Sequence, residues 1–307
     1  MATISAKDVM ELRKQTDCGM MECKKALTDA EGDFAKAVEL LREKGLATAS
    51  KKAGRVAAEG MVYATACSEC KVGVALEVNA ETDFVAKNDK FVDFVKKVAD
   101  VIIKENPADV EALMACKMGE GTVDDALKNL ILVIKENIKV RRFTRYEGVC
   151  AAYIHAGGTH AVLVNFDTTD EVAAKPEFAV YGKDLAMQIA AANPTYVCRE
   201  EVPADVLDKE KEILLAQMAN DPKTANKPEA VKEKMILGKV GKFYKENCLV
   251  DQAFVKDDKQ SVAQHTAQVG KELGGEIKII KFVRYEKGEG LEKRVDDFAS
   301  EVAGMVK

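Results

Sequence analysis

The side chains best suited to redox or metal chemistry are eight cysteines, spread through a chain of 307 residues. Only Cys67 and Cys70 are spaced as C-x-x-C, a pattern shared by zinc sites and thioredoxin-like redox pairs. A structural zinc site needs a second pair at matching spacing, and a thioredoxin-like pair opens a helix, whereas this pair separates two strand-like runs. We therefore expect a hairpin turn at Cys67 and Cys70, no metal site, and reduced thiols, as is usual in the cytosol.

Histidines offer little for acid–base catalysis, because the chain has only three: His155, His160 and His265. His155 and His160 flank Gly157 and Gly158 in a predicted hairpin, where a histidine is usually solvated. A Cys–His nucleophile pair is formally possible, but no feature of the sequence selects one. A thiol- or metal-dependent enzyme is therefore the first disfavoured alternative.

Nucleotide and nucleic-acid sites are disfavoured by motif and by charge. Gly-Lys pairs begin at residues 182, 238, 241 and 270, but none is followed by the Ser or Thr that a phosphate-binding loop needs. Two basic clusters, at 51–55 and 141–145, resemble RNA contacts, yet the net charge is −5, opposite in sign to a dedicated nucleic-acid binder. We interpret the clusters as solvated charges of a linker and an edge strand, and keep an RNA-binding protein as the second disfavoured alternative.

Composition favours a helix-rich chain outside the membrane. Hydrophobic residues make up 47% of the chain, enough for a core, but no apolar run approaches the roughly 18 residues of a membrane span. The first residues, M-A-T-I-S-A-K-D, lack the apolar segment of a secretory signal. We expect a cytoplasmic protein with no membrane partner.

The N-terminal pattern predicts three short helices within residues 1–47. Ser5 and Asp8 have the spacing of a capping box, Val9 and Leu12 share one face of the helix that follows, and Gly45 is expected to end the third helix. The small and basic residues beyond it, up to residue 60, are interpreted as a linker.

Beyond residue 60 the pattern changes to β structure. Val72, Val74, Leu76 and Val78 alternate with smaller or polar residues, and residues 61–65 supply a hairpin partner. Helical patterns follow, one of them capped by Thr122, and residues 139–147 have the pattern of a closing strand.

An internal repeat organises the rest of the chain. T-D-F-V-A-K-N-D-K-F at 82–91 matches T-D-E-V-A-A-K-P-E-F at 169–178, and R-F-T-R-Y-E-G at 142–148 matches K-F-V-R-Y-E-K at 281–287. The first offset is 87 and the second 139, so the second copy holds 52 further residues between its helices. The fold class is therefore α+β, with a three-helix domain and a ββα…αβ unit that occurs twice.

One detail of the repeat stays open, because Val162, Val164 and Phe166 fall on the opposite strand parity from Val74 and Leu76 at an offset of 87. A β-bulge and a different burial of the two sheet faces would each account for it.

The 52 extra residues, at about 195–250, carry two charged helical patterns with narrow apolar seams. We expect a helical hairpin that stands out from the body of the protein. Its seam needs a partner, and a second copy of the chain is favoured over packing against the parent subdomain.

The corner N-A-E-T-D-F-V-A-K-N at 79–88 places an aromatic ring where polar residues are usual. In one interpretation Thr82 or Asp83 caps the following helix and Phe84 fills a gap in the core. The second copy keeps Thr169 and Asp170 but has Glu171 in place of the ring, and a glutamate is a poor core residue. We therefore predict that the Thr-Asp pair builds the turn and that Phe84 is an exposed anchor for another protein.

The whole chain resembles the elongation factor Ts family. E-V-N-A-E-T-D-F-V-A-K-N at 77–88 matches the central motif of that family, and M-M-E-C-K-K-A-L at 20–27 resembles its N-terminal motif. I-A-A-A-N-P, K-P-E-A-V-K-E-K-M-I-L-G-K-V-G-K-F and Q-A-F-V-K-D match its later half.

The resemblance implies a nucleotide-exchange factor for the GTPase elongation factor Tu, with no cofactor and no catalytic residues of its own. It further implies that the corner, here Thr82, Asp83, Phe84 and Val85, contacts the partner and disturbs its magnesium site. The same resemblance implies additional partner contacts at Arg13, Met20, Met21 and His155.

The domain division expected from pattern and resemblance together has four parts. Residues 1–54 form a three-helix, ubiquitin-associated-like domain with its linker, 55–148 the first core subdomain, and 149–286 the second, which carries the coiled-coil hairpin. Residues 287–307 form a C-terminal helical module whose apolar stripe is Leu291, Val295, Phe298 and Val302.

Overall fold

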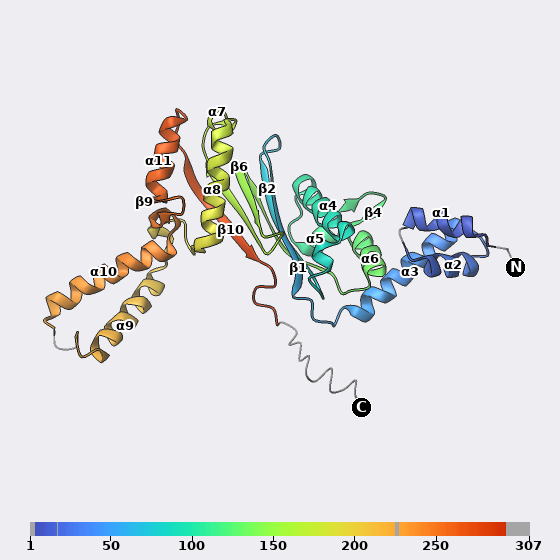
Figure 1. The fold of residues 1–307 in the computed structure, drawn as a ribbon, viewed down its shortest axis with the longest axis horizontal. Helices are drawn as coiled ribbons and strands as arrows, with labels where there is room; N and C mark the ends of the chain where they lie inside the picture. The colour runs from blue at the N-terminus through green and yellow to red at the C-terminus, as the bar shows by residue number, and fades with distance from the viewer. Residues whose placement is uncertain (1–3, 17, 225–226, 293–307) are drawn as a thin grey trace.

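The computed structural model describes residues 4–16, 18–224 and 227–292, and its fold is α+β (Figure 1). Two three-stranded antiparallel sheets lie near the middle of the molecule, each with helices packed on one face. The N-terminal helices lie at one end, and a helical hairpin projects near the other. Within the described part of the chain, every helix is too short or too polar to span a bilayer.

Three helices begin the chain: α1 (Ala6–Thr16), α2 (Met20–Asp29) and α3 (Phe34–Lys52). The predicted capping box is present, because the Ser5 backbone N–H donates to the Asp8 carboxylate at 2.9 Å and the Asp8 N–H donates to the Ser5 hydroxyl at 3.2 Å. These two bonds satisfy N–H groups that the first turn of a helix leaves without partners.

The predicted end of the third helix at Gly45 is wrong, since α3 continues to Lys52. Gly45 is buried, and a Cβ there would lie 3.4 Å from the carbonyl oxygen of Lys128 in α6 (Val123–Ile134). The glycine therefore lets α3 and α6 approach closely, and it serves packing rather than termination. Leu132 of α6 joins the apolar core of the first three helices at this contact.

The first sheet has the strand order β1-β2-β5, with every pair antiparallel. Its central strand is buried along its whole length, because helices cover one face and the second sheet covers the other. The strands and helices of this part are β1 (Glu59–Cys67), β2 (Val72–Ala80), α4 (Asp89–Glu105), α5 (Val110–Ala115), β3 (Lys117–Met118), β4 (Gly121–Thr122), α6 and β5 (Lys139–Glu147).

The second sheet repeats this arrangement with the order β6-β7-β10. Helices again cover one face of it, and the first sheet lies on the other. Its principal elements are β6 (Val149–His155), β7 (His160–Asp167), α7 (Asp170–Ala173), α8 (Pro176–Ala192), α11 (Val262–Glu272) and β10 (Lys278–Glu286). Shorter elements precede α11: η2 (Arg199–Glu201), η3 (Leu249–Asp251), β8 (Ala253–Phe254) and β9 (Asp257–Ser261).

The two sheets pack face to face through small and aliphatic side chains. Gly73 marks the closest approach, because a Cβ there would lie 2.5 Å from Leu163 Cδ1 and 2.8 Å from Cys150 Cβ. The Thr144 and Tyr285 hydroxyls are joined across the interface by a 2.7 Å hydrogen bond. The buried residues shared by the two sheets are Val62, Ala64, Ala75, Ala161, Leu163 and Tyr285.

The difference in strand parity between the two copies comes from neither a β-bulge nor a different burial of the sheet faces. Leu76 pairs with Phe143, and Val164 pairs with Phe282 at the equivalent place in the closing strand, so the central strands align at an offset of 88. The corner that follows aligns at 87, so the second copy is one residue shorter between strand and corner. Both closing strands carry a register shift at the same place, which means that a bulge does not distinguish the copies.

The extra residues of the second copy form two helices, α9 (Ala204–Asn220) and α10 (Glu229–Asn247), as the sequence predicts. The helices contact each other through buried Leu214, Met218 and Val240, and the hairpin extends away from the sheets (Figure 1).

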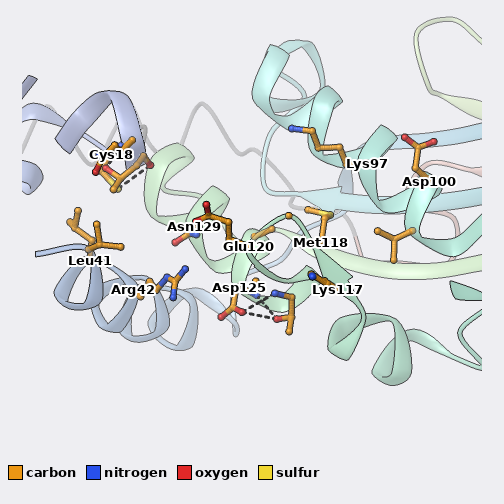
Figure 2. A pocket seen from close by; sticks show the side chains of 18 of the residues that line it. Cys18, Leu41, Arg42, Lys97, Asp100, Lys117, Met118, Glu120, Asp125 and Asn129 are labelled. Carbon is orange, nitrogen blue, oxygen red and sulfur yellow. Dashed lines mark hydrogen bonds between the residues drawn. The ribbon is translucent and has the colours of Figure 1, made fainter. Parts of the chain in front are cut away.

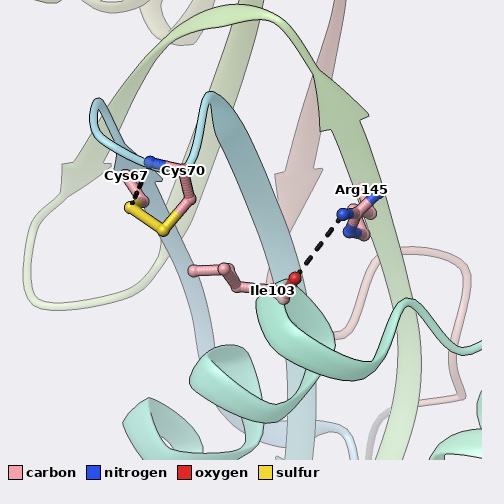
Figure 3. Close-up of a disulfide and its surroundings, with 4 residues drawn as sticks. All are labelled: Cys67, Cys70, Ile103 and Arg145. Atoms are coloured by element: carbon pink, nitrogen blue, oxygen red, sulfur yellow. Dashed lines mark hydrogen bonds between the residues drawn. A yellow bond between two sulfur atoms is a disulfide. The ribbon is translucent and has the colours of Figure 1, made fainter.

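The turn between β1 and β2 contains Cys67 and Cys70, as predicted, but the two sulfurs are joined in a disulfide, so the expectation of reduced thiols is wrong for this pair (Figure 3). A C-x-x-C spacing brings two thiols together in a tight hairpin turn as readily as at the start of a helix, because the turn folds the chain back on itself.

The interpretation of residues 141–145 as edge-strand charges is confirmed in position, because β5 is at the edge of its sheet, but these charges are not solvated. Arg141 and Arg142 lie on an edge strand, but both are half-buried and donate to the carboxylate of Glu77, which is fully buried in β2. Glu77 also accepts hydrogen bonds from Asn79 at 3.0 Å and from the Gly288 N–H at 2.9 Å. The cluster is therefore a buried ion-pair network that joins both copies of the repeat.

Replacing Glu77 with alanine is expected to lower the free energy of unfolding by about 3–5 kcal/mol, because two half-buried guanidinium groups lose the carboxylate that compensates their charge. Urea denaturation followed by circular dichroism measures this loss. Glu246→Ala is the control, since Glu246 is exposed in an exposed ion pair with Lys242, and its replacement is expected to cost less than about 0.5 kcal/mol. Equal losses in the two variants would contradict the assigned role of Glu77.

Candidate functional site

The corner after β2 is fixed to the fold by two side chains. The Glu81 carboxylate accepts a 2.6 Å hydrogen bond from the Asn137 N–H and forms an ion pair with Arg55. The Thr82 N–H and hydroxyl donate to the Glu136 carboxylate at 2.9 and 2.6 Å. Both anchors join the corner to the segment between α6 and β5, so the backbone enters the turn in one orientation.

Beyond these anchors, the corner presents one apolar side chain to solvent. Phe84 is 78% exposed, while the next residue, Val85, is 5% exposed and packs in the core under the helices. Asp83 is exposed, and within the described residues no hydrogen bond or ion pair holds its carboxylate. Asp83 and Phe84 therefore project from a rigid turn that Val85 supports from below.

Neither Thr82 nor Asp83 caps the following helix, as the alternative interpretation required, and the prediction that the Thr-Asp pair builds the turn holds for Thr82 but not for the Asp83 side chain. The short 3-10 turn η1 (Val85–Lys87) comes first, and Asn88 then caps α4 by accepting a 3.0 Å hydrogen bond from the Lys90 N–H. The Thr82 hydroxyl is already a donor to Glu136.

The corner of the second copy has the same frame with different chemistry. Thr169 caps α7 by accepting from the Val172 N–H, and Val172 is buried as Val85 is. Glu171 is exposed at the position of Phe84, and Asp170 pairs with Lys71. The position is thus a surface position in both copies, and the prediction that Phe84 is exposed is confirmed.

His155 lies at the tip of the β6–β7 hairpin and is exposed. Its Nδ1 is 3.0 Å from the Tyr153 hydroxyl, which orients the ring. The same hairpin contacts β1, because the Val62 N–H donates to the Gly158 carbonyl at 2.9 Å. Val62 pairs with Glu77, so the hairpin tip lies near the end of the first sheet from which the corner begins.

The remaining predicted contact residues belong to a separate surface. Arg13 is exposed on α1, and Met20 and Met21 are 47% and 75% exposed at the start of α2. The structure places these helices beyond α6, away from the sheets (Figure 1). The predicted site residues therefore form two surfaces, one around the corner and one on the N-terminal helices, rather than one constellation.

A cavity of about 1040 Å³ lies between the N-terminal helices and the core, beside the contact of α3 with α6. Figure 2 shows Cys18 and Leu41 on its N-terminal side and Lys97 and Asp100 of α4 on the other. Four basic and four acidic side chains line it, so its net charge favours neither anions nor cations. Across the described part of the chain, no group of three or more His, Cys, Asp or Glu side chains is arranged to hold a metal ion.

Sequence reasoning missed the carboxylates that hold the corner in place. Glu136 contacts Thr82 across 54 residues, and Asn137 contacts Glu81 across 56. No local pattern marks such pairs, because each depends on how α6 returns to the sheet. The stripe predicted for the C-terminal module lies mostly outside the described residues, with Leu291 alone within them.

Phe84→Ala is expected to change the free energy of unfolding by less than about 0.5 kcal/mol, because the ring is already in water. Val85→Ala is the matched control at the next residue, and its loss of buried surface is expected to cost about 2 kcal/mol. Urea denaturation of the two variants tests the assignment. A loss for Phe84→Ala as large as that for Val85→Ala would mean that the ring supports the fold.

Comparison with known proteins covers nearly the whole chain. The family model described as elongation factor TS matches residues 81–289, a span that includes most of the corner, the closing strand β5 of the first sheet and all of the second sheet. The elongation factor Ts of Symbiobacterium thermophilum is 50% identical over 307 residues, covering 98% of each chain. The elongation factor Ts of Clostridium perfringens is 48% identical over 306 residues, which cover 98% of this chain and 99% of that one. The elongation factor Ts of Trichlorobacter lovleyi is 48% identical over 308 residues, which cover 98% of this chain and 97% of that one. The chain therefore belongs to the elongation factor Ts family of translation factors.

Proposed function

We propose that this protein binds elongation factor Tu in its GDP-bound form and promotes the release of GDP, so that GTP can bind. It acts as a nucleotide-exchange factor in the cytoplasm and carries out no chemical step of its own. Family membership supports the partner, and one observation carries the site: Phe84 is 78% exposed on a corner whose neighbouring residues are held rigidly.

The proposed driving force is the burial of the Phe84 ring in an apolar pocket of the partner. Full burial of a phenylalanine side chain is worth about 1.5–3 kcal/mol. This free energy becomes available only if the partner opens the pocket by shifting the elements that hold its magnesium ion and phosphates. By linkage, the factor weakens GDP binding by the same ratio by which GDP weakens binding of the factor.

The neighbouring residues have distinct parts in this proposal. Asp83 presents a carboxylate that no group of the described chain neutralises, and Thr82 and Val85 fix the direction in which the ring points. A rigid corner loses little conformational entropy on binding, so more of the burial free energy remains for distorting the partner.

Further contacts are proposed for His155 and for the N-terminal surface of Arg13, Met20 and Met21. The exposed methionines add apolar area that adapts easily to a partner surface. Because the two surfaces lie on separate parts of the molecule, the factor would hold the GTPase at more than one place while Phe84 acts on the nucleotide site.

The domain division that accompanies this function is also a proposal. We assign residues 1–54 to a ubiquitin-associated-like domain, 55–148 and 149–286 to two core subdomains, and 287–307 to a C-terminal module that contacts the partner. The hairpin at about 195–250 is assigned as a coiled coil.

The release of fluorescent GDP from elongation factor Tu tests the function and the site. The wild-type protein should accelerate release, and Phe84→Ala should reduce the acceleration roughly ten- to hundredfold, because the burial free energy is lost. Glu171→Ala is the matched control, since it changes the equivalent position of the second copy and should leave release unaffected.

Two outcomes would contradict different parts of the proposal. No acceleration by the wild-type protein would overturn the function itself. Full acceleration by both Asp83→Ala and Phe84→Ala would overturn the site and leave the function standing.

As a second proposal, two copies of the protein associate through their helical hairpins. They form a homodimer alone, or a two-plus-two assembly once elongation factor Tu is bound. Leu237 is 71% exposed on α10, and Ile213, Leu215 and Val231 are exposed on the same hairpin. Sedimentation should give the mass of a dimer for the wild type and of a monomer for Leu237→Glu, because a charge would enter the apolar contact. Lys239→Glu changes charge on the same helix and should leave the dimer intact, whereas a monomeric wild type would contradict the proposal.

A further inference from the structure

The β1–β2 turn carries a disulfide whose two cysteine residues differ in exposure. Cys67 ends β1 and is half-buried, whereas Cys70 lies in the turn and is exposed (Figure 3). The backbone N–H of Cys70 donates a 3.1 Å hydrogen bond to Cys67 Sγ. Cys70 is therefore the more exposed of the two residues, and the sulfur of Cys67 is placed to carry negative charge.

We propose that Cys67 and Cys70 form a reversible thiol–disulfide exchange site, reduced by dithiols and reoxidised by small disulfides. The site is independent of the proposed exchange function, because the β1–β2 turn and the Phe84 corner lie at opposite ends of β2.

The exposure of the two cysteine residues sets the order of the steps. A thiolate of the reductant attacks Cys70 Sγ, the Sγ–Sγ bond breaks, and Cys67 leaves as a thiolate that keeps the hydrogen bond from the Cys70 N–H. The second thiol of the reductant then attacks the mixed disulfide and releases Cys70. Two electrons pass from the dithiol, which becomes a disulfide, and its two thiol protons end on Cys67 and Cys70.

The turn is fastened to the second copy of the repeat, so reduction has a structural consequence. The Lys71 carbonyl accepts a 2.8 Å hydrogen bond from the Gly148 N–H, and Lys71 Nζ lies 2.7 Å from both carboxylate oxygens of Asp170. Beneath the turn is a cavity of about 660 Å³, lined in part by Cys67, Lys71 and Asp170. Breaking the disulfide removes a constraint one residue from these contacts.

A third cysteine also lines this cavity, but its environment keeps it out of the exchange. Cys150 is partly buried between the sheets, and burial raises the pKa of its thiol. A thiol with a raised pKa holds little thiolate at neutral pH and reacts slowly. Cys150 is therefore not expected to compete with the two cysteines of the turn.

The test uses the full chain, equilibrated at a series of ratios of reduced to oxidised dithiothreitol. Free thiols are then trapped with iodoacetamide and located by mass spectrometry. Cys67 and Cys70 are expected to gain label together in a single two-electron transition, with labelling of Cys150 unchanged. Cys116→Ser is the control and should leave the transition in place. Thiols that stay reduced in excess oxidised dithiothreitol would overturn the proposal.

Two further measurements test the order of attack and the structural consequence. Cys67→Ser leaves the exposed Cys70 thiol and should react with oxidised glutathione severalfold faster than Cys70→Ser, which leaves Cys67; equal rates would overturn the order. Amide hydrogen exchange at Gly148 should be faster in the reduced wild type than in the oxidised form, and equal exchange would overturn the structural consequence.

GDP release separates this proposal from the exchange function. The Cys67→Ser variant should accelerate release from elongation factor Tu as the wild type does. A loss of acceleration in this variant would overturn the independence of the two sites, whatever the labelling result.

Discussion

The fully buried carboxylate of Glu77 is the interaction on which the arrangement of the two sheets depends. Removing a carboxylate from water costs several kcal/mol unless its lone pairs find donors, and here Arg141, Arg142, Asn79 and Gly288 supply them. These donors come from β2 itself, from β5 and from the segment that follows β10. The carboxylate therefore stays buried only while the end of the second copy lies against the first sheet.

The network around Glu77 brings the backbone at residue 288 close to that of Ala58, which explains why residue 288 is a glycine. Gly288 has a φ of +68°, and a Cβ there would lie 2.2 Å from the Ala58 carbonyl oxygen. No other residue fits without moving the backbone. Arg142 adds a contact of its own, with its guanidinium 4.2 Å from the centre of the Tyr285 ring. The sheets are thus joined by charge and stacking at the same edge at which the chain leaves β10.

A rigid pair of sheets allows the two corners to differ without loss of fold. The buried valines, Val85 and Val172, maintain the same frame, while the two positions before each valine are on the surface and free to change. In the second copy Asp170 is paired with Lys71 and serves the contact between copies. In the first copy the equivalent Asp83 has no such partner among the described residues, and Phe84 replaces a glutamate. The same frame therefore occurs twice, and the first corner differs in carrying an exposed aromatic ring where the second carries a glutamate.

Local periodicity was enough to locate most helices and strands, including β5 at residues 139–147, because each depends on residues close in sequence. Comparing Phe84 with Glu171 predicted an exposed ring for a physical reason, since a core position would not accept the glutamate.

The features that escaped prediction are contacts between distant residues or differences of one residue. Gly45 was predicted to end its helix because glycine commonly does so, and its packing role depends on Lys128, which is distant in sequence. The loss of one residue before the second corner was mistaken for a change of strand parity. The anchors of the corner belong to the same class, since Glu136 acts on Thr82 only after α6 has packed on the sheet. Sequence therefore identified the residue exposed at the corner, whereas the rigidity that makes its exposure useful depends on tertiary contacts.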